Sequence, residues 1–300
     1  MSVLIVGSVA LDSIKTPKRE HPRLLGGSAS HAAVAASFFA PVRLVGIVGD
    51  DFPRRYIELY QRHRINLDGL QVAQGKTFHW AGEYEVNMNN RRTLKTELGV
   101  FETFLPALPP GHQRTPFVLL ANIAPALQHH VLDQMRRPRF VIADTMDLWL
   151  NVALADLLRL LKRVDALVLN DSEARQLTQV DNVITAARRI HRLGPRYVIV
   201  KKGEHGSILS SPGGLFLCPA YPLGTVADPT GAGDSFVGGL IGWLASARGK
   251  IEANLRRGMI YGSVVASFCC EGFGLTSTTK TTRAQIDQRV AELQRLTAFQ

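Results

Sequence analysis

A turn of small residues followed by a carboxylate is the part of this sequence best suited to chemistry. In residues 228–236 (DPTGAGDSF), Gly231, Ala232 and Gly233 precede Asp234, and an apolar run follows. The first N–H groups of a helix have no intrahelical partner and carry partial positive charge, so they bind phosphate groups. Glycine lets the backbone approach a ligand closely. The segment therefore predicts an anion site beside a general base, Asp234, as phosphoryl transfer requires.

The apolar run after the turn predicts a buried helix over residues 233–247. Its apolar residues recur at helical spacing, at Phe236, Val237, Leu240, Ile241 and Leu244. Gly238, Gly239 and Gly242 weaken such a helix, so we expect close packing against a neighbouring element to compensate. An ordinary helix start with an acidic first turn is the alternative explanation for Asp234.

This nonapeptide resembles the second signature of the ribokinase-like carbohydrate kinase family, the PfkB family, which also contains adenosine kinases. The resemblance implies that the turn at 231–233 forms an anion hole and that Asp234 deprotonates the acceptor hydroxyl. It also implies ATP as phosphoryl donor and Mg²⁺ as cofactor. Asp228 and Thr230 match positions that often help to bind a monovalent cation such as K⁺, and Thr230 is expected beside the ATP.

Short apolar runs alternate with helical patterns along most of the chain. The strand candidates are residues 3–7, 42–48, 117–121, 140–143, 166–169 and 197–200. The helical patterns are residues 28–39, 53–62, 148–161, 182–193, 233–247, 251–270 and 283–296. This alternation predicts a single α/β domain over residues 1–300, with a doubly wound, mostly parallel sheet flanked by helices.

Two segments, residues 13–25 and 77–103, do not follow the alternation. The first is polar and irregular, and the second has strand-like alternation with a turn expected at residues 87–90. We expect them to form a small β lid, as the family resemblance also implies, although two ordinary surface excursions are the alternative. Parts of the family dimerise through this lid, so the resemblance leaves a homodimer open.

Two motifs after neighbouring predicted strands are candidates for the nucleotide side of the site. Asn170 and Glu173 stand where ligands bind in open α/β sheets, and Glu173 could orient Mg²⁺-bound water, although helix capping explains both residues as well. Lys201, Gly203 and Gly206 form a glycine turn that could meet phosphates or be a plain hairpin. The resemblance implies that both motifs border the ATP.

Residues near the N-terminus are candidates for the acceptor. Asp12 follows the first predicted strand, and Gly26 and Gly27 open the first helix. A carboxylate can accept two charge-assisted hydrogen bonds from vicinal hydroxyls. These three residues match family positions that hold the sugar. Family members usually have Asn where this chain has His31, which can still form hydrogen bonds, and this departure leaves the identity of the acceptor open.

Asn122 and residues 144–149 end other predicted strands at the same edge of the sheet. They are further candidates for the acceptor pocket, and packing or capping explains them equally well.

Composition narrows the classes of partner. The chain has 300 residues, 46% of them hydrophobic, and a net charge of +10 from scattered basic residues. An anionic substrate such as ATP explains that bias without nucleic acid, since no basic stripe contains interleaved aromatics. Three cysteines without metal-ligand or disulfide spacing favour a cytoplasmic location. No apolar run approaches the ~18 residues of a membrane span, so we expect no membrane partner.

These motifs together predict an ATP-dependent kinase that phosphorylates a hydroxymethyl group of a ribose- or fructose-like sugar. An adenosine-like nucleoside is the alternative acceptor in the same fold. A catalytically silent sugar- or nucleoside-binding protein is a second alternative, which the intact Asp234 and glycine turn disfavour. A nucleotide-dependent oxidoreductase is disfavoured because the first strand lacks a G-x-G-x-x-G turn.

Overall fold

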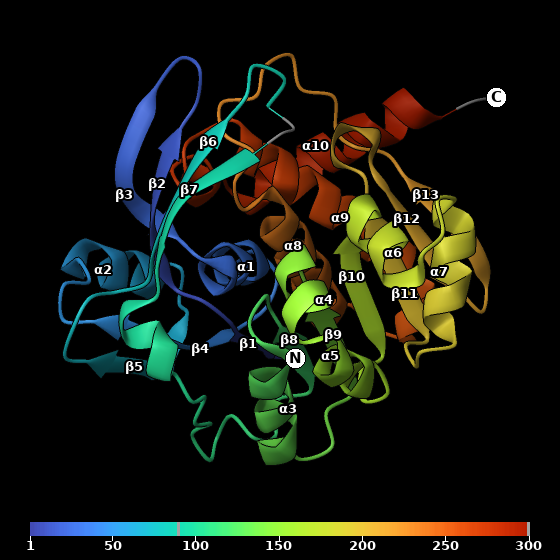
Figure 1. The fold of residues 1–300 in the computed structure, drawn as a ribbon. Helices are drawn as coiled ribbons and strands as arrows, with labels where there is room; N and C mark the ends of the chain where they lie inside the picture. The colour runs from blue at the N-terminus through green and yellow to red at the C-terminus, as the bar shows by residue number, and fades with distance from the viewer. Residues whose placement is uncertain (89–90, 299–300) are drawn as a thin grey trace.

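The computed structural model describes residues 1–88 and 91–298, which form a large and a small β-sheet with surrounding helices (Figure 1). Within these residues the large sheet has nine strands in the order β13-β12-β11-β10-β9-β8-β1-β4-β5. Its strands are β1 (Val3–Val6), β4 (Val42–Gly49), β5 (Asn66–Ala73), β8 (Phe117–Leu120), β9 (Phe140–Asp144), β10 (Ala166–Asn170), β11 (Tyr197–Lys201), β12 (Ser207–Ser211) and β13 (Gly214–Cys218). The sheet is parallel from β11 to β5, and only β12 and β13 are antiparallel. The predicted α/β class is confirmed.

Helices cover both faces of the large sheet. They are α1 (Ser28–Ser37), α2 (Arg54–Arg62), α3 (Pro125–Gln134), α4 (Asp147–Val152), α5 (Leu154–Leu161), α6 (Asp171–Thr178), α7 (Val183–His191), α8 (Ala232–Ser246), α9 (Ile251–Cys270) and α10 (Arg283–Thr297). The prediction of one helix over 148–161 is wrong, because the chain leaves helical geometry at Ala153 (φ −141°, ψ 31°). None of the described helices is both long and apolar enough to span a bilayer.

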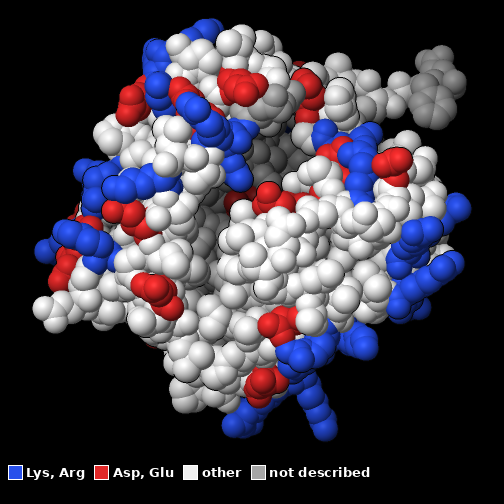
Figure 2. All heavy atoms as spheres, viewed as in Figure 1, with Lys and Arg blue, Asp and Glu red and all other residues white. Residues whose placement is uncertain are grey.

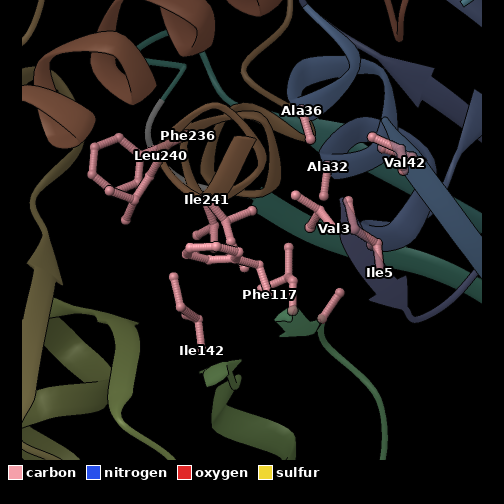
Figure 3. Close-up of a cluster of buried hydrophobic side chains, with 14 of the residues drawn as sticks. Val3, Ile5, Ala32, Ala36, Val42, Phe117, Ile142, Phe236, Leu240 and Ile241 are labelled. Atoms are coloured by element: carbon pink, nitrogen blue, oxygen red, sulfur yellow. The ribbon is translucent and has the colours of Figure 1, made fainter. Parts of the chain in front are cut away.

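Alternate residues of β1 face two separate hydrophobic cores. Val3 and Ile5 pack with α1, α8 and α9, whereas Leu4 and Val6 pack with α3, α5, α6 and α7. This two-sided burial explains why the strands read as continuous apolar runs rather than as alternating patterns. Figure 3 shows the first core, in which the apolar side chains of α8 face Phe117 of β8.

Helix α8, which carries the predicted base, packs closely on two other helices. A Cβ added at Gly238 would lie 2.6 Å from Ala32 Cα, and one at Gly242 would lie 2.7 Å from Ala36 Cα, both in α1. The expected close packing is therefore present, and it offsets the low helix propensity of these glycines. The result is a buried helix whose first turn has a fixed position.

The two segments that broke the alternation contribute the small sheet, which stands at the upper left of Figure 1. Its strands are β3 (Glu20–Gly26), β2 (Ala10–Lys15), β6 (His79–Tyr84) and β7 (Arg91–Glu97), in that spatial order. Of the turn expected at 87–90, Asn87 lies in a turn, and Asn89 and Asn90 lie outside the described residues. The function of this sheet as a lid stays a prediction.

Candidate active site

Polar residues gather where the parallel strands of the large sheet end. Asp144 ends β9, Asn170 ends β10 and Lys201 ends β11, and Asn170 and Lys201 are register partners. From β1 the chain builds the sheet outward in both directions, through β4 on one side and β8 on the other. Ligands bind at such a switch point in open α/β sheets. Figure 2 shows a hollow at this level, between the small sheet and the rest of the molecule.

The glycine turn has the geometry of an anion site. Gly231 is the N-cap of α8 at φ 77°, a conformation that residues with a Cβ rarely adopt. The N–H of Ala232 already donates to Pro229 O (3.1 Å), so the later N–H groups of the first turn are the candidates for an anion. A Cβ at Gly233 would lie 3.1 Å from Lys201 Nζ, which puts a cation beside the turn.

Asp234 lies in the first turn of α8, partly exposed to solvent. Burial and the Asp144 carboxylate raise the pKa of its carboxyl to about 7, against the opposing charges of Lys201 and Arg91. A carboxyl with a pKa near neutrality is well suited to accept a proton from a hydroxyl at physiological pH.

A buried ion pair lies next to Asp234. Lys201 Nζ is 3.2 Å from Asp144 Oδ1, and Asp144 is only 4% exposed. Burial lowers the pKa of Lys201, but the carboxylates of Asp144, Glu173 and Asp234 more than offset it, so the pKa lies above its usual value. Lys201 is therefore a charged ammonium among three carboxylates.

Asn170 and Glu173 form a capping box at the start of α6. Glu173 Oε2 accepts the Asn170 N–H (2.7 Å), Glu173 Oε1 accepts the Asn170 side-chain amide (2.6 Å), and Asn170 Oδ1 accepts the Glu173 N–H (2.8 Å). Burial raises the pKa of Glu173 to about 7. The capping alternative is thus realised in the structure, and an effect on Mg²⁺-bound water stays a prediction.

The acceptor-side carboxylate is buried in the small sheet. Asp12 on β2 is 5% exposed and lies against Gly26, where any Cβ would overlap its carboxylate. Burial, together with the charges of Asp228 and Asp234, raises the pKa of Asp12 to about 7, although a hydrogen bond from the Gly27 backbone opposes this shift. Asp12 and Asp234 therefore lie close enough to interact electrostatically, although Asp12 comes from the small sheet and Asp234 from α8.

Two of the predicted acceptor residues are engaged inside the protein. His31 on α1 is 1% exposed, and its ring fills the space where a Cβ of Gly231 would be. Burial lowers the pKa of His31 to about 4, so the ring is neutral at physiological pH. The side-chain carbonyl of Asn122 accepts the Trp149 indole N–H (2.8 Å). Contact of either residue with an acceptor stays a prediction.

Asp228 is fully buried before the turn. Its Oδ1 accepts the Thr230 N–H (2.9 Å), and its Oδ2 accepts the Gly274 N–H (3.0 Å). Both oxygens thus hold backbone groups in place, and a monovalent cation at this position stays a prediction.

A pocket of about 510 Å³ opens beside the turn. The glycine motif that helps to line it begins with the 3₁₀ turn Gly203–His205 and ends at Gly206, which has φ 78°. The Lys202 N–H donates to Gly206 O (2.8 Å) and closes the turn. Gly233 and Phe236 of α8 also line the pocket. A nucleotide could occupy this space with its phosphates at the turn.

Two residues of the site were not found from the sequence. Tyr84, the last residue of β6, accepts a hydrogen bond from Thr230 Oγ1 (3.0 Å). The charge of Arg91, the first residue of β7, lowers the pKa values of both Asp12 and Asp234. The strand pattern of this segment does not indicate which of its side chains reach a site on another element. Asp144 had been one of several strand-end candidates, and its pairing with Lys201 distinguishes it.

The donor set is compatible with a divalent cation bound mainly through phosphates and water. The described residues hold no cluster of three His, Cys, Asp or Glu side chains placed to chelate a metal. The Asp144 carboxylate is nevertheless close enough to raise the pKa values of both Glu173 and Asp234. Mg²⁺ prefers such oxygens and keeps several of its waters.

The parallel sheet, the anion turn with its near-neutral carboxyl and the adjoining nucleotide-sized pocket define a phosphotransferase of the ribokinase-like class. Residues 6–282 match the pfkB family of carbohydrate kinases, and the chain belongs to this family. It is 28% identical to the cytidine kinase of Thermococcus kodakarensis over 267 residues, which cover 86% of this chain and 94% of that protein.

Solved structures agree on the fold. The nucleoside kinase of Burkholderia thailandensis, solved with inosine, has a TM-score of 0.78 at 22% identity and covers 97% of this chain and 96% of its own. The fructokinase of Vibrio cholerae, solved with fructose, ADP and calcium, has a TM-score of 0.79 at 17% identity and covers 96% and 98%. The family match and the aligned relative make the chain a sugar or nucleoside kinase.

Proposed function

We propose that this enzyme transfers the γ-phosphoryl group of ATP to the hydroxymethyl group of a nucleoside. The observation that carries the proposal is Asp234, a carboxyl with a pKa of about 7 in the first turn of α8, which follows the pocket-lining Gly233 and is close enough to Asp12 to raise its pKa. The nucleoside is favoured over a free sugar because a cytidine kinase and a nucleoside kinase align along 86% and 89% of the chain. A ribose- or fructose-like sugar is the second candidate, since the fold also matches a fructokinase.

In this proposal Asp12 and Asp234 have different functions in the reaction. Asp12 accepts hydrogen bonds from the vicinal hydroxyls of the ribose and so orients the hydroxymethyl group. Asp234 takes the proton of that hydroxyl as its oxygen attacks the γ-phosphorus and the bond to ADP breaks. The first-turn N–H groups of α8 and the Lys201 ammonium stabilise the charge on the transferring group.

The ATP would lie in the pocket beside Gly203 and Gly206, with its phosphates at the turn of Gly231 and Gly233. Mg²⁺, near Glu173, would neutralise part of the phosphate charge. K⁺ near Asp228 is proposed only from the family resemblance. The small sheet would close over the acceptor as a lid and exclude water, which protects ATP from hydrolysis.

The acceptor is identified by an ADP-release screen over cytidine, adenosine, inosine, other nucleosides, ribose, fructose and their phosphates, with ATP and Mg²⁺. A nucleoside should give the highest kcat/KM, as the alignment with a cytidine kinase and a nucleoside kinase suggests. Preference for a free sugar by tenfold or more would contradict the nucleoside assignment and support the second candidate. If none of the acceptors raised ADP release above background, both candidates would be contradicted.

The base is tested by Asp234→Asn. Turnover should fall at least ~10²-fold, as expected for the loss of a general base, while ATP binding measured by calorimetry is retained. Asp133→Asn, a change at an exposed acid on α3, is the matched control and should leave turnover unaltered. Near wild-type turnover in Asp234→Asn would rule out this role.

A further inference from the structure

One hydrogen bond joins the small sheet directly to the loop that precedes the base. Thr230 Oγ1 donates to Tyr84 Oη at 3.0 Å, across 146 positions of sequence. Tyr84 is 6% exposed and ends β6, and Thr230 directly precedes Gly231. A buried contact of this kind connects parts of the chain that no local pattern relates.

Thr230 is held in place by hydrogen bonds with residues outside the small sheet. Its N–H donates to Asp228 Oδ1 (2.9 Å), and its carbonyl accepts the Cys269 thiol (3.3 Å). The position of its hydroxyl therefore follows the position of the turn at Gly231 rather than the small sheet. Tyr84 is therefore hydrogen-bonded to a hydroxyl that residues outside the small sheet hold in place.

Tyr84 belongs to the sheet that carries the acceptor carboxylate. Strand β6 pairs in parallel with β2, and Asp12 on β2 is the register partner of Trp80 on β6. The hydrogen bond thus joins the sheet of Asp12 to the loop that leads into Asp234. It is a link between the two carboxylates that the proposed reaction must hold at a fixed separation.

The tyrosine also lies beside Arg91. The two are register partners on β6 and β7, and Arg91 acts electrostatically on Asp12 and Asp234. Burial raises the pKa of Tyr84 to about 12, which outweighs the hydrogen bond from Thr230 and the charge of Arg91. The phenol stays neutral at physiological pH, so the bond persists over the whole range in which Asp234 titrates.

We infer that Tyr84 is a positioning residue for phosphoryl transfer: its hydrogen bond with Thr230 sets the small sheet, and Asp12 with it, at the correct distance from Asp234. The inference rests on the proposed function. Tyr84 acts through the two carboxylates and touches neither the ATP nor the reacting oxygen. When the bond is absent, the sheet departs from the turn more often, and water reaches the γ-phosphate in place of the acceptor.

The direct test is Tyr84→Phe, which keeps the buried ring and removes the hydroxyl. Loss of one neutral hydrogen bond should lower kcat for acceptor phosphorylation about 3- to 10-fold. The KM for ATP should change less than about twofold, because the pocket is intact, and ADP released per acceptor phosphorylated should rise. Wild-type kcat and an unchanged ratio of ADP to product would overturn the inference.

Variants at the other end of the bond separate positioning from packing. Thr230→Val removes the hydroxyl that donates to Tyr84 and should reproduce the Tyr84→Phe defect. The double variant should be no worse than either single one, since both remove the same interaction. Fully additive defects would overturn the assignment. The control is Tyr261→Phe, which removes a hydroxyl that donates to Asp287 Oδ1 (2.8 Å) between α9 and α10. It should leave kcat and the ratio of ADP to product unchanged.

A measurement that needs no acceptor keeps this inference distinct from the proposed function. Amide hydrogen exchange over β6 should be faster in Tyr84→Phe than in the wild-type protein, and unaltered in Tyr261→Phe. Unchanged exchange in Tyr84→Phe would overturn the inference even for an active kinase. An inactive wild-type enzyme in the acceptor screen would contradict only the proposed function.

Discussion

The near-neutral pKa of Asp234 depends on side chains from three other elements. Asp144 comes from β9, Lys201 from β11 and Arg91 from β7, and each changes the free energy of the Asp234 carboxylate. In sequence, Asp234 is an ordinary first-turn acid, whose charge the helix dipole would favour. Burial and the adjacent Asp144 reverse that preference. The proton affinity of the proposed base is thus a property of the assembled site.

The pH dependence of the reaction follows from this pKa. As a base, Asp234 must lose its proton, so kcat/KM should rise with pH up to about 7 and level off above it. Lys201→Met removes a charge that lowers this pKa and should move the acid limb to higher pH. Asp144→Asn removes a charge that raises it and should move the limb to lower pH. The pH profiles of the three proteins provide the check, and a limb that stays in place in both variants would contradict the assignment.

At the scale of elements, close packing of α8 on its neighbours determines where the anion turn lies. Gly238 and Gly242 bring α8 against α1, and Gly262 of α9 lies against the other side of the helix, 3.1 Å from a Cβ placed at Gly239. Apolar periodicity predicted α8, α9 and α10 correctly, because a buried stripe repeats at the helical period. It missed the break at Ala153, because both parts of that segment continue the same period in sequence while changing direction in space.

The packing of α8 can be tested with one methyl group. Gly238→Ala would place a Cβ 2.6 Å from Ala32 Cα, so the helices must separate. Overpacking of this kind costs about 1–3 kcal/mol of unfolding free energy, which should exceed the gain in helix propensity. Urea denaturation measures the difference. Gly111→Ala, at a glycine with open space around it, is the control and should change stability little. A Gly238→Ala protein as stable as the wild type would contradict the packing argument.

At the scale of the whole molecule, the site exists only where the two sheets meet. The small sheet supplies Asp12, Tyr84 and Arg91, the large sheet supplies Lys201, and α8 supplies Asp234. Burying carboxyls at this junction raises their pKa values, so the folded state binds protons that the unfolded chain releases. At neutral pH the unfolding free energy is therefore lower than it would be if these functional carboxyls kept their ordinary pKa values in the folded protein.

The sign of this effect can be stated for Asp12. Its pKa is about 7 in the folded protein and 3.8 for the ordinary group, so between these values only the folded state holds the proton. The contribution of Asp12 to the unfolding free energy should therefore be largest near pH 4 and fall as pH rises to about 7. The Asp12→Asn variant lacks this contribution. The unfolding free energy of the wild-type protein should therefore fall relative to that of the variant as the pH rises from 5 to 8. Parallel denaturation curves at these pH values provide the measurement, and a constant difference would contradict the raised pKa.

The sequence by itself determined the fold class, the buried strands and the anion turn with its carboxylate, because these depend on local period and on residue types within a few positions of one another. It also placed Lys201 at a strand end, where parallel topology collects ligands. The same prediction for Asp12 is wrong, because Asp12 lies within β2 of the small sheet. Only the tertiary structure decided which strand-end residues pair, that Glu173 caps its own helix, and that His31 lies beneath Gly231. It alone brought Tyr84 and Arg91 to the turn, because contacts across 146 positions depend on how sheets and helices pack, and no local pattern records that packing.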